Sequence, residues 1–302
     1  MMRTLILYVF HKLNENVDIF LKRGLLTDPN KQFIFIFNDK EADPKSEKWD
    51  FLHKYSNMHL YIRPNVGHDF QGWNEGLFLP ASALKQKIIF HPEAVHKQAL
   101  DKETDSISED EYKPVHSLFD RFICLNSTTM GPYLPRYVTS DWVDCFTSKL
   151  SEEVKMTGIS VNFISGCHDN YMASVVQKNY GFSPKDHVHV QSMIFGLDRE
   201  GLDILLRYRL FHKGKKFDSV ENKWYLICAA EVAMSSILRH EKKSIYSYMM
   251  NQGLVKYDDV RPIPDVWCMH DMYPLCETMF IKINGMNTFP EKTKYDASLL
   301  LP

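Results

Sequence analysis

The segment Arg63-Pro-Asn-Val-Gly-His-Asp-Phe-Gln-Gly-Trp-Asn-Glu-Gly-Leu77 joins an apolar run, residues 58–62, to a helical pattern of apolar residues. A buried strand, a polar loop and a helix in this order are typical of open α/β sheets, which keep their binding residues in such loops. Gly67 and Gly72 bracket the polar residues between them, and glycine lets the backbone turn sharply or approach a ligand closely. The segment therefore predicts either a binding loop or a connection whose polar residues merely cap the next helix.

The N-terminal part of the chain alternates apolar runs with helical patterns. Residues 4–10, 32–38 and 58–63 are rich in β-branched and aromatic residues, as expected of strands covered on both faces of a sheet, with the first strand central. A helix capped by Asn16 is expected after the first strand, so the order β-α-β-α-β predicts a Rossmann-like half with right-handed crossovers. No G-x-G-x-x-G follows the first strand, which argues against a nucleotide-dependent oxidoreductase.

The composition is that of a globular protein without a bulk electrostatic partner. The 302 residues, 44% of them hydrophobic, can bury a substantial core. Lys and Arg number 36 against 38 Asp and Glu, mixed along the chain, which favours neither nucleic acid nor a membrane surface as a partner. The 6 cysteines lack C-x-x-C spacing and the apolar run at residues 4–10 is too short for a signal peptide or a membrane span. We therefore expect a cytoplasmic protein with reduced thiols and no transmembrane segment.

A further strand is predicted over residues 119–125, after a polar surface excursion at residues 93–115 that lacks periodicity. It leads directly into Asn126-Ser-Thr-Thr-Met-Gly-Pro132. Because Gly-Pro indicates a turn, Asn126, Ser127 and Thr128 should lie at the carboxyl end of that strand. The carboxyl ends of parallel strands share one edge of a sheet, so the loops after Phe37, Ile62 and Leu125 are predicted to converge there.

The C-terminal half carries the candidate acid–base residues. The first half of residues 187–202 alternates like a strand that places His187 and His189 on one face, where they can bind a metal, position a substrate or lie on the surface, and Asp198 should begin a helix. Glu231 stands alone among apolar residues at the expected start of another helix. Apolar surroundings favour the neutral form of a carboxyl group, which suits a general base, whereas a position on the helix dipole would explain Glu231 by stability alone.

Several of these segments resemble the glycosyltransferases related to rhamnan-synthesis protein F. The string Asn65-Val-Gly-His-Asp-Phe-Gln-Gly-Trp-Asn-Glu-Gly-Leu77 is similar to that family's loop, roughly Arg-x-Asn-x-Gly-x-Asp-Phe-Gly-x-(aromatic). In the same order follow the Asn126 segment with its Gly-Pro, Gln191-Ser192, the helix after Glu231, and Tyr273-Pro-Leu-Cys-Glu-Thr-Met-Phe-Ile-Lys282. Together they span almost the whole chain.

The resemblance implies an α/β fold of the GT-A type: a Rossmann-type, mostly parallel sheet flanked by helices. One domain would cover residues 1–289, with a nucleotide-sugar-binding half at 1–135, an acceptor and catalytic half at 136–289, and a tail at 290–302. It implies a hexosyl- or deoxyhexosyltransferase that moves a sugar from a nucleotide-sugar donor to a carbohydrate acceptor in glycan biosynthesis, with inversion. The alternative is a catalytically inactive glycan-binding or scaffold protein derived from the same fold.

Site residues follow from the matched positions. The donor would be bound by Asn38, Arg63, Asn65, Gly67, Asp69, Asn126 and Ser127. The acceptor would be bound by His187, His189, Gln191 and Ser192. Glu231 would be the general base, with Asp198 and Asp169 as alternatives, and Glu277 and Lys282 would pair with each other or contact the donor phosphate.

The resemblance leaves metal dependence open. The family carries an Asp at the position of Ser127, and a carboxylate is the usual ligand of Mg²⁺ or Mn²⁺. We expect a divalent cation, if one is used, to be carried mainly by the diphosphate. Protein ligands would then come from Asp69, Asp169, His187 or His189.

Overall fold

The computed structural model describes residues 2–92, 112–135, 137–163, 169–217, 223–249, 252–259 and 279–282. Two compact units make up the chain. Unit 1 comprises Met1–Leu13, Leu26–Asn126 and Phe211–Glu221, and unit 2 comprises Asn14–Leu25, Ser127–Leu210 and Asn222–Pro302. Most of the predicted surface excursion, the tail at 290–302 and Glu277 lie outside the described residues.

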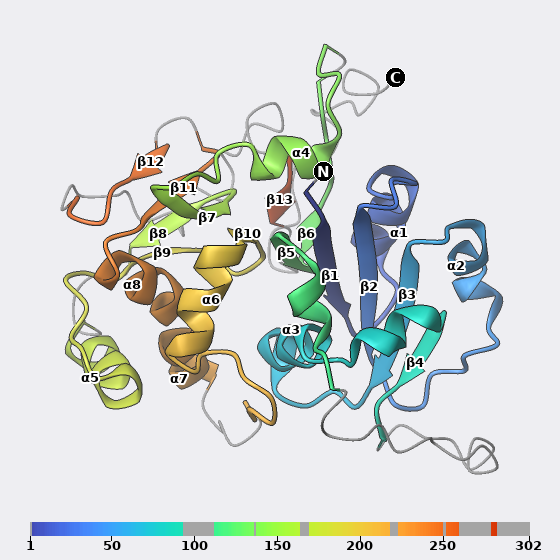
Figure 1. The fold of residues 1–302 in the computed structure, drawn as a ribbon, viewed down its shortest axis with the longest axis horizontal. Helices are drawn as coiled ribbons and strands as arrows, with labels where there is room; N and C mark the ends of the chain where they lie inside the picture. The colour runs from blue at the N-terminus through green and yellow to red at the C-terminus, as the bar shows by residue number, and fades with distance from the viewer. Residues whose placement is uncertain are drawn as a thin grey trace. The chain divides into compact units, whose positions relative to one another are not determined.

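Unit 1 is built on five parallel strands that stand side by side in the order β5-β1-β2-β3-β4 (Figure 1). The strands are β1 (Thr4–Phe10), β2 (Lys31–Asn38), β3 (Met58–Arg63), β4 (Ile88–Phe90) and β5 (Arg121–Asn126). The helices are α2 (Phe51–Lys54) and α3 (His68–Leu77), with shorter 3₁₀ turns η1 (Glu47–Trp49), η2 (Ala81–Lys85) and η5 (Val115–Leu118). All seven residues of β1 are buried, which confirms the prediction of a central strand covered on both faces.

Two glycines let α3 lie close against β1 and β2. A Cβ on Gly72 would come within 2.9 Å of Val9 Cγ2, and one on Gly76 within 2.9 Å of Ile36 Cδ1. Gly72 was predicted to turn the loop, but it lies inside the helix and serves packing instead. Gly67, with φ of 69°, is the glycine that makes the turn before α3.

Unit 2 has its own mixed set of strands in the order β12-β11-β7-β10. In that set β11 runs parallel to β7, whereas β10 and β12 run antiparallel to their neighbours. The bounds are β7 (Val154–Gly158), β10 (Ile194–Asp198), β11 (Ser244–Ser247) and β12 (Leu254–Val255). Two short antiparallel pairs complete the strands: β8 (Val161–Phe163) with β9 (Val188–Val190), and β6 (Thr129–Met130) with β13 (Ile281–Lys282).

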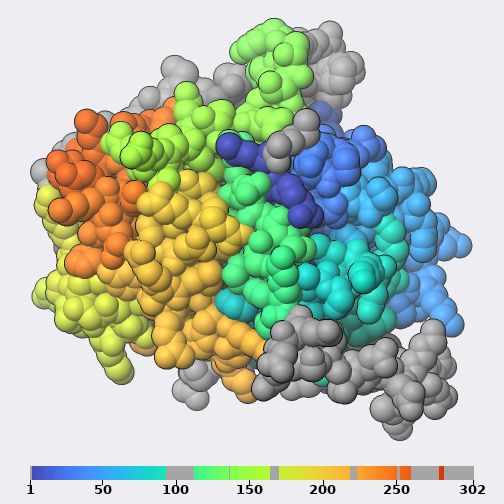
Figure 2. Space-filling view, in the orientation of Figure 1, coloured from blue at the N-terminus to red at the C-terminus, as the bar shows by residue number. Residues whose placement is uncertain are grey.

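The helices of unit 2 are amphipathic or buried. They are α1 (Glu15–Arg23), α4 (Trp142–Thr147), α5 (Asp169–Tyr180), α6 (Arg199–Arg207), α7 (Lys223–Leu226), a π-helical turn (Ile227–Val232) and α8 (Ala233–His240). Figure 2 shows α6 on the near face, where its polar side faces solvent while Leu202 and Leu205 are buried. No described helix is long and apolar enough to cross a bilayer.

The structure confirms the predicted α/β class, with mostly parallel strands flanked by helices, and corrects two local predictions. The cap of α1 is Asn14, whose side chain accepts from the Val17 N–H, and not Asn16. The strand predicted over the first half of residues 187–202 is only β9, and β10 follows it in a different sheet. Asp198 does begin α6 as its N-cap, as expected.

Candidate functional site

The strand order of unit 1 contains a topological switch point. From β1 the chain adds β2, β3 and β4 on one side, whereas β5 pairs with the other side of β1. In open α/β sheets, ligands bind outside the carboxyl ends of the strands where the order reverses. For this unit that place lies beyond Phe10 of β1 and Asn126 of β5.

The side chains of Asp69 and Asn126 meet at this switch point. Asn126 Nδ2 donates to Asp69 Oδ2 at 2.7 Å, and the Trp73 indole N–H donates to the Leu125 carbonyl at 3.3 Å. Asp69 is half-buried in the first turn of α3, and Asn126 is 7% exposed. The predicted convergence of the loops after β3 and β5 is confirmed by these contacts.

Arg63, at the end of β3, is buried in a network of its own. Its guanidinium pairs with Glu75, with Nε 2.7 Å from Oε2, donates to Asn38 Oδ1 at 2.7 Å, and donates to the Val66 carbonyl at 2.7 Å. Tyr61 and Gln71 also donate to the Glu75 carboxylate. Burial is the main reason that the pKa of Tyr61 is raised, and the Glu75 charge adds to it.

This network confirms that the ends of β2 and β3 converge, but it gives Arg63 a structural task. The Arg63 side chain is 1% exposed, so direct contact with a diphosphate would require that bonds to Glu75, Asn38 or Val66 be broken. We assign Arg63 the positioning of Asn38 and of the loop that carries Gly67. Asn65, by contrast, is exposed in that loop.

Sequence reasoning missed three residues of this edge. Glu75 closes the Arg63 network. A buried arginine requires such a partner, and the next helix offers two carboxylates, Asp69 and Glu75, as candidates. His11 and Lys12 directly follow β1 and are exposed at the switch point. Their position directly after the central strand was the signal that could have indicated them.

Glu231 occupies the π-helical turn between α7 and α8. Its Oε1 accepts the backbone N–H of Ser192 at 2.8 Å, and the side chain is half-buried. Glu231 was predicted to lie at the start of a helix. The described helix begins at Lys223, so Glu231 lies in its interior instead. The dipole explanation therefore fails, because that effect is confined to the first turn. π-helical turns inside α-helices are frequent at functional sites.

Helix α5 packs against the π-helical turn. The Tyr180 hydroxyl donates to the Ala229 carbonyl, and burial raises the pKa of Tyr180. Met172 and Val175 of α5 pack with Cys228 and Val232. These contacts hold the backbone on either side of Glu231 in place.

The loop after β5 reaches the same part of unit 2. Asn16 Nδ2 donates to the Ser127 carbonyl at 2.9 Å, and Thr129 Oγ1 donates to the Met193 carbonyl at 2.9 Å. Met193 follows Ser192, which holds Glu231. The structure thus brings the Ser127 loop, the Gln191–Ser192 loop and Glu231 together within one unit.

The two histidines are buried, which overturns the reading of them as surface residues. His187 is 6% and His189 is 2% exposed, and His189 Nδ1 donates to the His187 carbonyl at 2.7 Å. Gln191 is also buried and accepts from Ser160 Oγ at 2.6 Å. Of the residues predicted to bind the acceptor, Ser192 contacts Glu231.

The alternative base Asp198 lies at the far end of β10 from Ser192. Four residue steps separate Ile194 from Asp198, or about 13 Å along an extended strand. Both Asp198 oxygens are engaged: Oδ1 accepts the Gly201 N–H at 2.7 Å and Oδ2 pairs with Lys155 Nζ at 2.8 Å. We assign Asp198 a capping role. Asp169 is placed as the first residue of α5.

Metal ligands do not gather in the part of the chain that the structure describes. No group of three or more His, Cys, Asp or Glu side chains there is arranged to hold an ion. Ser127 and Thr128 offer neutral oxygens only.

A scan against known protein families finds no match, and a comparison with curated proteins also finds none. The resemblance to the rhamnan-synthesis protein F family therefore stays a prediction. Among solved structures, the chain is similar to the apo structure of the bifunctional glycosyltransferase WbbM, with a TM-score of 0.29 and 10% identity over 76% of this chain and 38% of that chain. This chain thus spans well under half of that protein.

Proposed function

We propose that the protein is a glycosyltransferase that moves a sugar from a nucleotide-sugar donor to a carbohydrate acceptor. The observation that carries the proposal is the Asp69–Asn126 pair at the switch point of unit 1, where open α/β sheets bind nucleotides. Asp69 would accept hydrogen bonds from hydroxyl groups of the nucleotide sugar, and Asn126 would accept from or donate to them. The exposed Lys12 would offset the charge of the diphosphate. Arg63 cannot do so directly, because its side chain is buried and paired with Glu75.

Glu231 is proposed as the general base of an inverting transfer. The acceptor hydroxyl oxygen forms a bond to the anomeric carbon, the bond from that carbon to the diphosphate breaks, and the electron pair leaves with the diphosphate. The hydroxyl proton passes to the Glu231 carboxylate. The Ser192 N–H holds Oε1, which leaves Oε2 to take the proton. The turn that carries Glu231 is held by α5, so the carboxylate is pre-positioned for this step.

A divalent cation, Mg²⁺ or Mn²⁺, would be carried mainly by the diphosphate under this proposal. The neutral oxygens of Asn126, Ser127 and Thr128 are weak ligands compared with a carboxylate. Changing a nearby carboxylate or histidine should therefore leave any metal dependence of the activity unchanged. Strict dependence on Mn²⁺ that is abolished by changing one nearby carboxylate or histidine would overturn this part of the proposal.

One observation favours the second candidate, an inactive glycan-binding or scaffold protein of the same fold. Ser127 stands where the resembling enzymes carry an Asp, and the loss of a metal ligand is one way in which such an enzyme loses activity. Incubation with a panel of nucleotide sugars separates the two functions. An enzyme releases nucleotide diphosphate when an acceptor is added, whereas glycan binding without any release on the whole panel would support the scaffold.

A further inference from the structure

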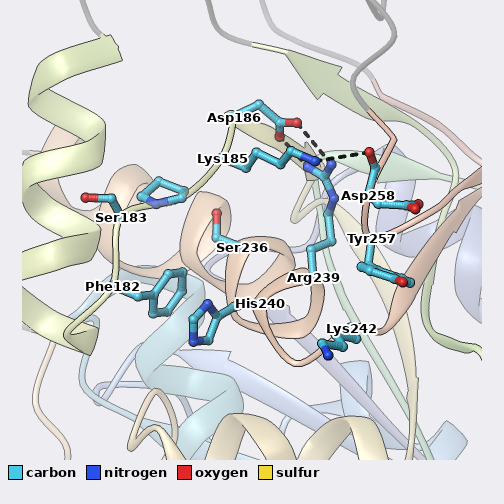
Figure 3. Close-up of a pocket in the computed structure, with 11 residues that line it drawn as sticks. Phe182, Ser183, Lys185, Asp186, Ser236, Arg239, His240, Lys242, Tyr257 and Asp258 are labelled. Carbon is cyan, nitrogen blue, oxygen red and sulfur yellow. Dashed lines mark hydrogen bonds and ion pairs between the residues drawn. The ribbon is translucent and has the colours of Figure 1, made fainter.

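A pocket of about 280 Å³ opens in unit 2, away from the residues assigned to catalysis. It is lined by three segments, residues 182–186, 236–242 and 257–258 (Figure 3). The C-terminal half of α8 forms one wall, and the connection before β9 forms another. The volume suits a small ligand, at the lower end of the range for ligand pockets.

An arginine–aspartate pair forms the floor of the pocket. The Arg239 side chain is 6% exposed, pairs with both carboxylate oxygens of Asp186, and donates to the Asp259 carbonyl at 2.8 Å. Arg239 Nε has no acceptor among the described residues. That nitrogen is fully buried, so a ligand hydroxyl could reach only the exposed part of this pair, of which the Asp186 side chain, at 15% exposure, offers more than Arg239.

Flat aromatic faces flank this floor. Phe182 and His240 stack with ring centroids 4.1 Å apart and an interplanar angle of 12°, so each covers one face of the other, and Phe182 is only 9% exposed. The rings open to a ligand are those of His240, which is exposed, and of Tyr257, which is 39% exposed. In Figure 3 the stacked pair and Tyr257 lie on opposite sides of Arg239. Such faces bind the apolar C–H surface of a ligand while the polar floor binds its edge.

The charges of the pocket nearly balance. The lining includes Lys185, Arg239 and Lys242 together with Asp186 and Asp258, and Lys185 Nζ donates to the Asp258 carbonyl at 3.2 Å. The buried cation, Arg239, is already paired with the Asp186 carboxylate, whereas a phosphate site would present its buried cation unpaired. Mixed donors and acceptors between aromatic faces match a neutral ligand with C–H faces and hydroxyl edges, which is the chemistry of a sugar ring.

The pocket and Glu231 lie at opposite ends of two elements that pack together, the helix that ends with α8 and strand β9. Arg239 is eight residues beyond Glu231, or about 12 Å along the helix. Strand β9 runs the other way, from Asp186 beside the pocket towards Ser192 beside Glu231. Ser235 Oγ accepts the Val190 N–H at 3.0 Å and joins α8 to β9. The two places are therefore separate, with buried residues of α8 and β9 between them.

We propose that this pocket is a second saccharide subsite, which binds a neutral sugar residue of the carbohydrate acceptor at a distance from Glu231. The inference rests on the proposed glycosyltransferase function. It adds that the acceptor is longer than one sugar and that its recognition is shared between two places in unit 2.

The test is binding of neutral monosaccharides to the full chain, measured by saturation-transfer-difference NMR with glucose, galactose, mannose and N-acetylglucosamine. We expect at least one sugar to bind, and Tyr257→Ala to weaken its affinity by about tenfold or more, because a stacking face is removed. The matched control is Tyr171→Ala on α5, since Tyr171 is 38% exposed and lies outside the pocket. This control should bind as the parent chain does.

Three results would overturn the subsite: no sugar of the panel binds, Tyr257→Ala binds as the parent chain does, or inorganic phosphate displaces the bound sugar. Both tyrosines are exposed, so neither variant should unfold, and circular dichroism checks this. The assay needs no nucleotide sugar, and Glu231→Gln should bind the sugar normally. Sugar binding without turnover would therefore reject the proposed enzymatic function but not the sugar-binding pocket. Turnover without sugar binding would reject the subsite but not the enzymatic function.

Discussion

The backbone N–H of Ser192 donates a 2.8 Å hydrogen bond to Oε1 of Glu231, and this contact joins a loop beside β10 to a π-helical turn. One carboxylate oxygen is held by a backbone donor that no side-chain rotation can withdraw. The orientation of the second oxygen is thereby fixed as well. This is the kind of support that a general base requires, because proton transfer depends on geometry before it depends on acidity.

Replacement of Glu231 by Gln should lower turnover by about 10²- to 10⁴-fold, the usual worth of general-base assistance. Gln retains an oxygen that can accept from Ser192, so donor affinity and folding should be nearly unchanged. The measurement is the release of nucleotide diphosphate in single-turnover and steady-state assays. Asp203→Asn on α6, 53% exposed, is the control and should behave as the parent.

Asp198→Asn separates the two candidate carboxylates. Asn keeps an oxygen that accepts the Gly201 N–H and so keeps the cap, whereas loss of the Lys155 ion pair should lower the free energy of unfolding by about 1 kcal/mol. Turnover per folded molecule should not change. A large fall in turnover for Asp198→Asn, with normal turnover for Glu231→Gln, would exchange their roles.

Asp69→Ala should weaken donor binding by about ten- to a hundredfold, the cost of one hydrogen bond to a charged group. Titration with a nucleotide-sugar panel, followed by calorimetry, measures the change. Asp120→Ala is the matched control, because Asp120 lies before the amino end of β5, whose carboxyl end carries Asn126. Equal donor binding by both variants would place the donor site elsewhere.

Arg63→Ala should destabilise the fold by about 3–5 kcal/mol, because it leaves the Glu75 carboxylate largely buried without its ion pair. Urea unfolding measures this loss. The double variant Arg63→Ala/Glu75→Ala should cost less than the sum of the single changes, since no unpaired charge remains. Arg207→Ala, at 62% exposure, tests an exposed ion pair with Glu241 and should cost no more than about 1 kcal/mol.

Gly72→Ala should lower stability by up to about 2 kcal/mol. Overpacking against the stiff Val9 side chain costs about 1–3 kcal/mol, partly offset by the roughly 1 kcal/mol gained when alanine replaces glycine in a helix. Gly76→Ala should cost less, because the contacting Ile36 Cδ1 is the end of a flexible side chain. A stabilised Gly72→Ala variant would show that α3 shifts freely on β1.

His59 should make stability fall at acid pH. Burial lowers the pKa of His59 below its ordinary value of 6.5, and His59 Nδ1 donates to the Gln86 carbonyl at 2.7 Å. Between the folded pKa and 6.5, the unfolded chain binds the proton and the folded chain does not, so acidification favours unfolding. This contribution is at most about 1.4 kcal/mol per pH unit. Urea midpoints at pH 7.5 and 5.5 should therefore fall less for His59→Gln than for the parent.

The amino-acid sequence by itself determined the elements of this protein wherever the evidence is local. The apolar runs at β1, β2 and β3 appear as strands, and Asp198 begins α6, because burial patterns and helix caps depend on residues a few positions apart. The edge that carries Asn38, Asp69 and Asn126 was also predictable, since carboxyl ends of parallel strands share one side of a sheet.

Only the tertiary structure decided which polar side chains are already paired and which are exposed. Arginine is a common phosphate-binding residue, yet the Arg63 side chain is already bound by Glu75 and Asn38. Burial of His187 and His189 depends on strands paired across a sheet. Gly72 serves packing because β1 lies beneath it. The pocket around Arg239 draws on three separate segments. Such contacts join residues far apart in the chain, and their free energy depends on packing that no local pattern contains.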